Sequence, residues 1–174
     1  MVSGPLFFST IDVTRQAFLR TALSYAIVNL KPIVPGHVLV IPTRPVKRLI
    51  DLSSEEVTSL FSTAQKVGKV VEEAYKADAL TIACQDGKAA GQSIPHVHIH
   101  ILPRRSKGDK FENDNDQIYP ALEKSESELS RDFQISQGQK HEVLKVDADE
   151  HRTLRSVEEM EKEAVWLRSL FLSD

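Results

Sequence analysis

The sequence predicts an α+β fold, an antiparallel sheet of about five strands with two main helices packed on one side of it. Three observations support this prediction. Short apolar and β-branched runs dominate the first third of the chain, a long amphipathic helix pattern follows them, and two further strands precede a last helix. Because the connections between these strands are short, we expect neighbouring strands to run in opposite directions.

The first strands lie in the N-terminal quarter of the chain. Apolar runs at residues 6–8 and 23–28 are expected strands, and residues 13–19 show a weaker pattern of the same kind. Pro35-Gly36 then predicts a turn that places His37 at the head of a strand over residues 38–41. A histidine in this position is either a polar residue at a strand edge or part of a site.

Two capping boxes mark the expected helix starts. Ser53 with Glu56 precedes apolar residues spaced as on one helix face, which predicts a helix of about 22 residues that packs against the sheet. Ser156 with Glu159 precedes a second apolar stripe, which predicts a C-terminal helix at about 156–172. Between these helices, residues 79–84 are expected to form another strand.

Three histidines alternate with aliphatic residues within Pro95–Pro103. Valine and isoleucine at every second position favour a strand, in which successive side chains point to opposite faces. His96, His98 and His100 are therefore expected in one row, with about 6.6–7 Å between neighbours. The aliphatic residues between them are expected to face the core.

Three interpretations of this row are open from the residues alone. It can be a solvated strand face, a metal site in which two imidazoles bind one zinc ion, or a catalytic row in which one imidazole attacks and its neighbours transfer protons. A metal site would combine the row with His37. The wide spacing, and the lack of a carboxylate or cysteine nearby in the sequence, count against the metal site.

The stretch Cys84–Ile94, rich in glycine and alanine, leads directly into the histidine row. Small residues let backbone N–H groups approach an anion closely, and Gln92 and Ser93 add side-chain donors. The alternative is a plain turn, which Asp86-Gly87 alone could form. Since a two-residue turn does not need ten residues, we favour an anion cradle. Cys84 is expected to point into the core and has no catalytic role.

His96-Val97-His98-Ile99-His100, followed by Ile101-Leu102-Pro103-Arg104, resembles the signature of the histidine triad (HIT) superfamily. Residues 85–87 and 90–93 (QDG and AGQS), together with residues 29–40 (NLKPIVPGHVLV), are similar to its Fhit branch, the diadenosine triphosphate hydrolases. The likeness covers roughly residues 6–120 and 152–172. It implies a HIT-like fold, one HIT domain over residues 1–174, and a homodimer, for which Trp166 and Phe171 on the final helix offer apolar surface.

The resemblance also implies an activity, the cleavage of diadenosine triphosphate to AMP and ADP through a covalent nucleotidyl-histidine. His98, central in the row, would be the nucleophile, and His100 would stabilise or protonate the leaving group. His96 and His37 would orient and charge the row. The expected substrate-binding residues are Asn29 at the ribose, and Gln85, Gly91, Gln92, Ser93, Ile94 and His100 around the phosphates; Tyr119 would lie in a flexible loop over the site.

The polyphosphate is expected to bring magnesium or manganese with it, so no metal site within the protein is expected. Alternative functions within the superfamily are another nucleotide hydrolase, a phosphoramidase or a phosphorylase. A non-catalytic nucleotide-binding or signalling module is a further alternative, in which Tyr119 and the acidic segment serve partners. A turnover assay with diadenosine triphosphate distinguishes the catalytic hypotheses from the non-catalytic one.

Composition limits the class of protein. At 174 residues the length favours one domain, no apolar stretch approaches the ~20 residues that cross a bilayer, and no secretory signal is expected. A single cysteine fits a reducing compartment, so we expect a cytoplasmic protein, with the nucleus as a second candidate compartment. The net charge of −3 gives no basic footprint for nucleic acid.

Residues 107–150 hold 12 acidic and 6 basic residues, a net charge of −6, and lack an apolar period. We therefore expect a mobile acidic loop at about 106–152, with Lys124–Asp149 dispensable for turnover. The part at 123–150 looks like an insertion, so the resemblance assigns it no role.

Overall fold

The computed structural model describes residues 4–136, 138 and 154–172. Its centre is a five-stranded antiparallel sheet in the order β3-β4-β5-β7-β6, which confirms the predicted sheet. These strands are β3 (Ala17–Arg20), β4 (Ser24–Val28), β5 (Val38–Pro42), β6 (Ala79–Ala83) and β7 (Ile99–Arg104). A separate hairpin, β1 (Phe7–Phe8) with β2 (Ile11–Asp12), precedes them.

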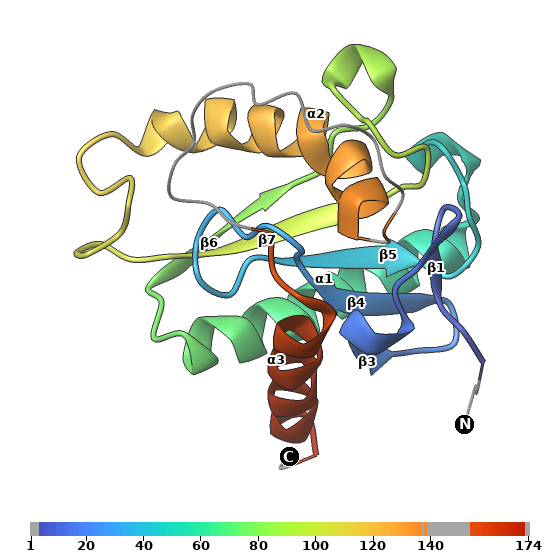
Figure 1. Ribbon diagram of the computed structural model, residues 1–174, viewed down its shortest axis with the longest axis horizontal. Helices are drawn as coiled ribbons and strands as arrows, with labels where there is room; N and C mark the ends of the chain where they lie inside the picture. The colour runs from blue at the N-terminus through green and yellow to red at the C-terminus, as the bar shows by residue number, and fades with distance from the viewer. Residues whose placement is uncertain (1–3, 137, 139–153, 173–174) are drawn as a thin grey trace.

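Three α-helices flank the sheet: α1 (Ser54–Ala74), α2 (Ile118–Ser136) and α3 (Val157–Leu170). Figure 1 shows α1 and α2 on opposite sides of the sheet, with α3 near α1 at the β3–β4 end. The expectation that the helices cover one side only is therefore wrong, because α2 covers the other. Within the described residues, no helix is both long and apolar enough to cross a membrane.

Helix α1 starts where the capping box predicts. The Ser53 side chain accepts a hydrogen bond from the backbone of Glu56, and the Glu56 carboxylate accepts one from the backbone of Ser53. The buried face of the helix includes Leu60, Val67 and Val71, which belong to the same core cluster as the aliphatic residues of β7. The opposite face of β7 is thereby left to His100. The second predicted capping box, at Ser156, begins α3.

Helix α2 corrects the predicted mobile loop. Its buried face carries Ile118, Leu122, Leu129 and Phe133, a helical stripe that packs on the sheet side. Glu126 takes the place in this stripe where another apolar residue would stand, and for that reason the sequence showed no period. The rest of the predicted loop, at 137 and 139–153, lies outside the described residues.

The histidine strand is also shorter than predicted, because β7 begins at Ile99. The backbone N–H of His96 donates to the carbonyl of Ile94, and that of Val97 donates to the carbonyl of Val46. These bonds turn the segment away from the sheet ladder. His96 and His98 therefore precede the strand, and only His100 lies within it.

Candidate active site

His98 lies at the centre of the site with 1% of its surface exposed. Its Nδ1 is 2.8 Å from the backbone carbonyl oxygen of His96. A carbonyl oxygen can only accept, so Nδ1 carries the proton and donates it. In the neutral ring the lone pair is then at Nε2. The fold thus determines which nitrogen of His98 is a nucleophile.

His96 supports this arrangement through its own fixed ring. The backbone N–H of Ser9 donates to its Nδ1, so the proton lies on Nε2, which donates to the carbonyl of Pro42 at 2.8 Å. Burial lowers the pKa of His96 to about 4, which keeps the ring neutral at physiological pH. His96 therefore acts on His98 through its backbone and does not stand in a row of side chains beside it.

His37 and His100 form a directed pair. The backbone N–H of Ile33 donates to His37 Nδ1, so His37 is protonated at Nε2 and donates to His100 Nδ1 at 2.9 Å. His100 therefore carries its proton at Nε2, facing the site. Complete burial lowers the pKa of His100 and favours this neutral form. Asn29 lies beside the pair, with its amide nitrogen 3.3 Å from His37 Nε2. Both atoms carry hydrogens in this arrangement, so this is a contact and not a hydrogen bond.

Glu126 of α2 enters the site between these rings and is fully buried. Its Oε2 lies 2.9 Å from His98 Nε2 and 3.3 Å from His100 Nε2. Its Oε1 accepts hydrogen bonds from the backbone N–H and the hydroxyl of Ser93. Burial alone would raise the pKa of this carboxyl, but hydrogen bonds from His100 and His98 hold the pKa below its usual range. With Glu126 ionised, the contact to His98 requires a further proton on Nε2.

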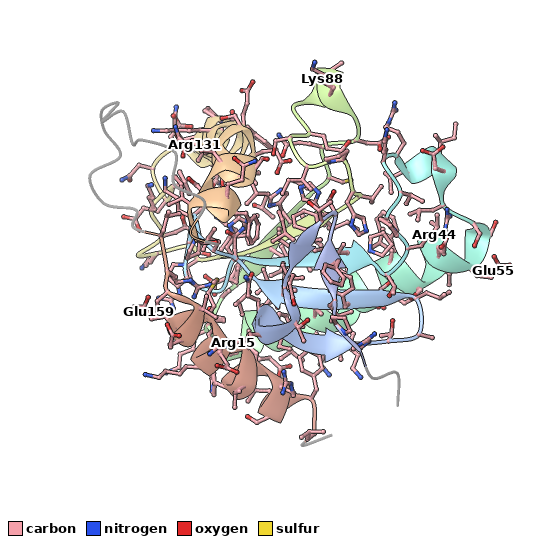
Figure 2. The ribbon with its side chains drawn as sticks, turned by 45° about the vertical axis from the view of Figure 1, so that its right-hand side comes forward. Arg15, Arg44, Glu55, Lys88, Arg131 and Glu159 are labelled. Atoms are coloured by element: carbon pink, nitrogen blue, oxygen red, sulfur yellow. The ribbon has the colours of Figure 1, made fainter. Side chains whose placement is uncertain are left out.

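The predicted cradle contributes through Ser93 more than through its other side chains. Gln92 closes the loop on itself by accepting from the backbone N–H of Gly87. Gly91 has a φ of +92°, and a Cβ there would lie 3.1 Å from the amide nitrogen of Gln85. The Oε1 atom of Gln85 is buried and has no hydrogen-bond partner among the described residues. Ile94 supports the bend at His96 through its carbonyl. Lys88 projects outward from the tip of the loop (Figure 2).

Two further sequence predictions concern Tyr119 and Cys84. Tyr119 lies in the first turn of α2, is 62% exposed, and lines a surface hollow with Thr81 and Arg104. No histidine lines this hollow, and the position of Tyr119 over the histidines stays a prediction. Cys84 is partly buried against the core, as expected, and burial raises the pKa of its thiol to about 11, which disfavours the nucleophilic thiolate.

Sequence reasoning missed Glu126 and the N-terminal hairpin. Phe8 packs edge-on against the His98 ring, with ring centroids 5.1 Å apart, and Ser9 fixes His96. The spacing of Ile118, Leu122, Leu129 and Phe133 was the available signal for Glu126. For Phe8 and Ser9 the sequence holds no comparable signal, because the hairpin reaches the site only through the fold.

The site also supplies a carboxylate that the sequence appeared to lack for a metal centre. His98, His100 and Glu126 present ligand atoms that lie within 4.8 Å of one another. Two imidazole nitrogens and one carboxylate suit zinc better than magnesium or manganese, which prefer oxygen ligands. The set therefore does not fit the divalent cation expected with a polyphosphate.

In chemical terms, the site combines three functions. Once His98 gives up the proton that it shares with Glu126, it offers a lone pair at Nε2. His100 offers a proton at Nε2, and Ser93 offers two donors to an anion. This combination fits nucleophilic displacement at an anionic centre, in which the attacked atom lies near His98 and the leaving atom near His100.

Comparisons with known proteins agree with this geometry. A family model described as HIT domain matches residues 11–107. The bis(5'-nucleosyl)-tetraphosphatase (asymmetrical) of Schizosaccharomyces pombe is 47% identical over an alignment 174 residues long. The alignment, including its gaps, covers 95% of this chain and 94% of that protein. The bifunctional bis(5'-adenosyl)-triphosphatase/adenylylsulfatase FHIT of Arabidopsis thaliana is 50% identical over 157 residues, 90% of this chain and 78% of that protein.

Among solved structures, the C. elegans NitFhit protein is similar, with a TM-score of 0.69 at 36% identity. The match covers 98% of this chain and 31% of the C. elegans chain, so the present chain spans about a third of that protein.

Proposed function

Because this chain belongs to the HIT domain family, we propose that it hydrolyses dinucleoside polyphosphates and cleaves diadenosine triphosphate to AMP and ADP. The observation that carries this proposal is the fixed orientation of two rings: His98 Nδ1 donates to the carbonyl of His96 and His100 Nδ1 accepts from His37, so that both Nε2 atoms face the site. The named activities of the two curated relatives support the substrate class.

The first chemical step is attack by His98. Its Nε2 forms a bond to the α-phosphorus of one adenosine, and the bond from that phosphorus to the bridging oxygen breaks. ADP leaves with the bonding electron pair, and His100 donates its Nε2 proton to the departing oxygen. The carbonyl of His96 stabilises the positive charge that the ring of His98 gains, through the Nδ1 hydrogen bond.

The second step releases AMP. Water attacks the phosphorus of the nucleotidyl-His98 intermediate, the phosphorus–nitrogen bond breaks, and His98 regains its lone pair. His100, which lost its proton in the first step, accepts one from the attacking water. Ser93 holds a phosphate oxygen through its backbone N–H and hydroxyl in both steps, with Gln85, Gln92 and the backbones of Gly91 and Ile94 forming the surrounding loop.

Magnesium or manganese enters this scheme with the substrate. The polyphosphate oxygens are hard ligands that bind these cations well, whereas the site presents mainly imidazole nitrogen. Bound to the polyphosphate, the cation would neutralise part of its negative charge.

A turnover assay tests the proposed function. Purified protein with magnesium should convert diadenosine triphosphate to equal amounts of AMP and ADP. A parallel assay with diadenosine tetraphosphate is needed, because the S. pombe relative is named for that length. If neither compound is cleaved while AMP binds, the non-catalytic module is the better description. Stoichiometric zinc that survives dialysis would favour the metal protein.

We also propose that the protein is a cytoplasmic homodimer, with the nucleus as a second candidate compartment. The feature that supports the dimer is β6, an edge strand whose Ile82 is 52% exposed. Of the two residues predicted to form the interface, Phe171 packs on Phe18 in its own chain, whereas Trp166 is 43% exposed. Light scattering at micromolar concentration tests the dimer, and imaging of a fluorescent fusion tests the compartment.

A further inference from the structure

A buried carboxylate needs partners, and Glu126 has all of its partners within the proposed catalytic machinery. Its two oxygens contact His98, His100 and both donors of Ser93, at 2.9–3.3 Å. An isolated charge in such a position would be strongly unfavourable. The four contacts offset this cost, so the site is already built to hold an anionic group with two oxygens.

These partners are the groups that the proposed function assigns to the reacting phosphate. A carboxylate and a phosphate both present negatively charged oxygens that accept hydrogen bonds. We propose that Glu126 is an internal phosphate analogue, and that α2 holds the free protein in a closed, self-inhibited state. This inference rests on the proposed function for the identity of the displaced ligand.

Substrate cannot reach the site while α2 is in this position. The exposed fractions of His98, His100 and Glu126 are 1%, 0% and 0%, so none of the reacting nitrogen atoms has a route to a dinucleotide. Binding must therefore displace Glu126 and shift the helix that carries it. The apparent affinity for substrate is reduced by the fraction of molecules that are closed.

The closed position is held at both ends of the helix. Ile118 and Leu122 pack with Leu102 and Phe111, whereas Leu129 and Phe133 join the main core. Glu128 forms an ion pair with Lys31 at 3.1 Å. Arg131 lies on the outward side of α2, where Figure 2 shows it, about 140° around the helix from Glu126. Only the inward face of α2 is thus committed to the site.

The test uses the full chain and two variants that weaken closure differently. Glu126→Ala removes the phosphate analogue, and Leu129→Ala removes apolar contact one turn away without touching substrate. Glu123→Ala, an exposed carboxylate on the same helix, is the matched control. The first readout is steady-state kinetics with diadenosine triphosphate. The second is the rate at which diethyl pyrocarbonate modifies His98 and His100, followed by mass spectrometry, which needs no catalysis.

Both closure variants should lower KM about tenfold or more, without a fall in kcat, and should raise the modification rate by a similar factor. Glu123→Ala should match the parent in both readouts. If the parent protein turns over substrate and neither variant changes KM or the modification rate, the closed state is wrong while the function stands. Faster modification in a protein that never cleaves the substrate would retain closure and reject the function. A large loss of kcat in folded Glu126→Ala would make Glu126 part of the chemistry and overturn the inference.

Discussion

The Nε2 atom of His37 lies 2.9 Å from Nδ1 of His100, and this contact fixes the proton of His100 on the nitrogen that faces the site. The direction of the bond follows from the backbone N–H of Ile33, which occupies the other nitrogen of His37. His37 need not contact the substrate, but it thereby determines which nitrogen of His100 protonates the leaving group.

His37→Leu should lower kcat by roughly 10²-fold, because His100 is then free to place its proton on Nδ1. His37→Gln keeps a donor near the position of Nε2 and should recover most of this loss. The pH profile of kcat should shift in the leucine variant and return in the glutamine variant. Equal losses in both variants with unchanged pH profiles would indicate a packing role for His37.

The buried ring of His96 makes stability depend on pH. Its pKa in the folded protein is about 4, below the ordinary 6.5, so the folded state binds fewer protons than the unfolded chain between these values. The stabilisation is complete above pH 6.5 and is lost as the pH falls towards 4, by at most about 3 kcal/mol. Urea unfolding at several pH values measures this slope, and His96→Gln should flatten it.

The capping box of α1 gives a stability prediction that is separate from the chemistry. Ser53→Ala removes the acceptor for the backbone of Glu56 and should lower the free energy of unfolding by about 1 kcal/mol. Thr58→Ala, at an exposed position on the same helix, should change it by less than about 0.5 kcal/mol. Both variants should keep the parent kcat, since α1 packs on the face of the sheet opposite the histidines.

The proposed dimer predicts a specific sensitivity at the edge strand. Ile82→Lys places a charge on β6, which should prevent pairing with a second copy and yield a monomer. Ile50→Lys makes the same change at a position that is 84% exposed outside the sheet, and it should leave the dimer intact. Light scattering measures the molar mass of both variants in solution. An Ile82→Lys protein that stays dimeric would place the interface elsewhere.

Much of the fold follows from local patterns. The strand around Ala26, the turn at Gly36 and the helix after Ser53 each have a clear period or capping signal, and the structure places them within a few residues of the prediction. The residues at which strands begin and end were less predictable. The strand with His100 starts late because Val97 donates to Val46, a contact between distant segments that no local pattern encodes.

The residue types of the site were predictable from the sequence, but the position of Glu126 over the histidines was not. The alternating histidines and the serine at the end of the glycine-rich stretch were visible in the sequence. The role of His96 was not, because its ring turns to Pro42 and Ser9 and acts through its carbonyl. Glu126 was missed because a charged residue interrupts the apolar pattern of a helix face. Its partners, Ser93, His98 and His100, come from another part of the sequence.

His98 is the proposed nucleophile, and a rapid alkaline quench identifies the residue that forms the covalent bond. Phosphorus–nitrogen bonds on histidine survive base and are labile in acid, so protein mixed with substrate and quenched in alkali should carry a nucleotide on His98. His98→Asn keeps a donor to the carbonyl of His96 and should still bind substrate, but with turnover reduced by at least about 10⁴-fold and no trapped label. A label mapped to His96 or His100, or substantial turnover by His98→Asn, would show that His98 is not the nucleophile.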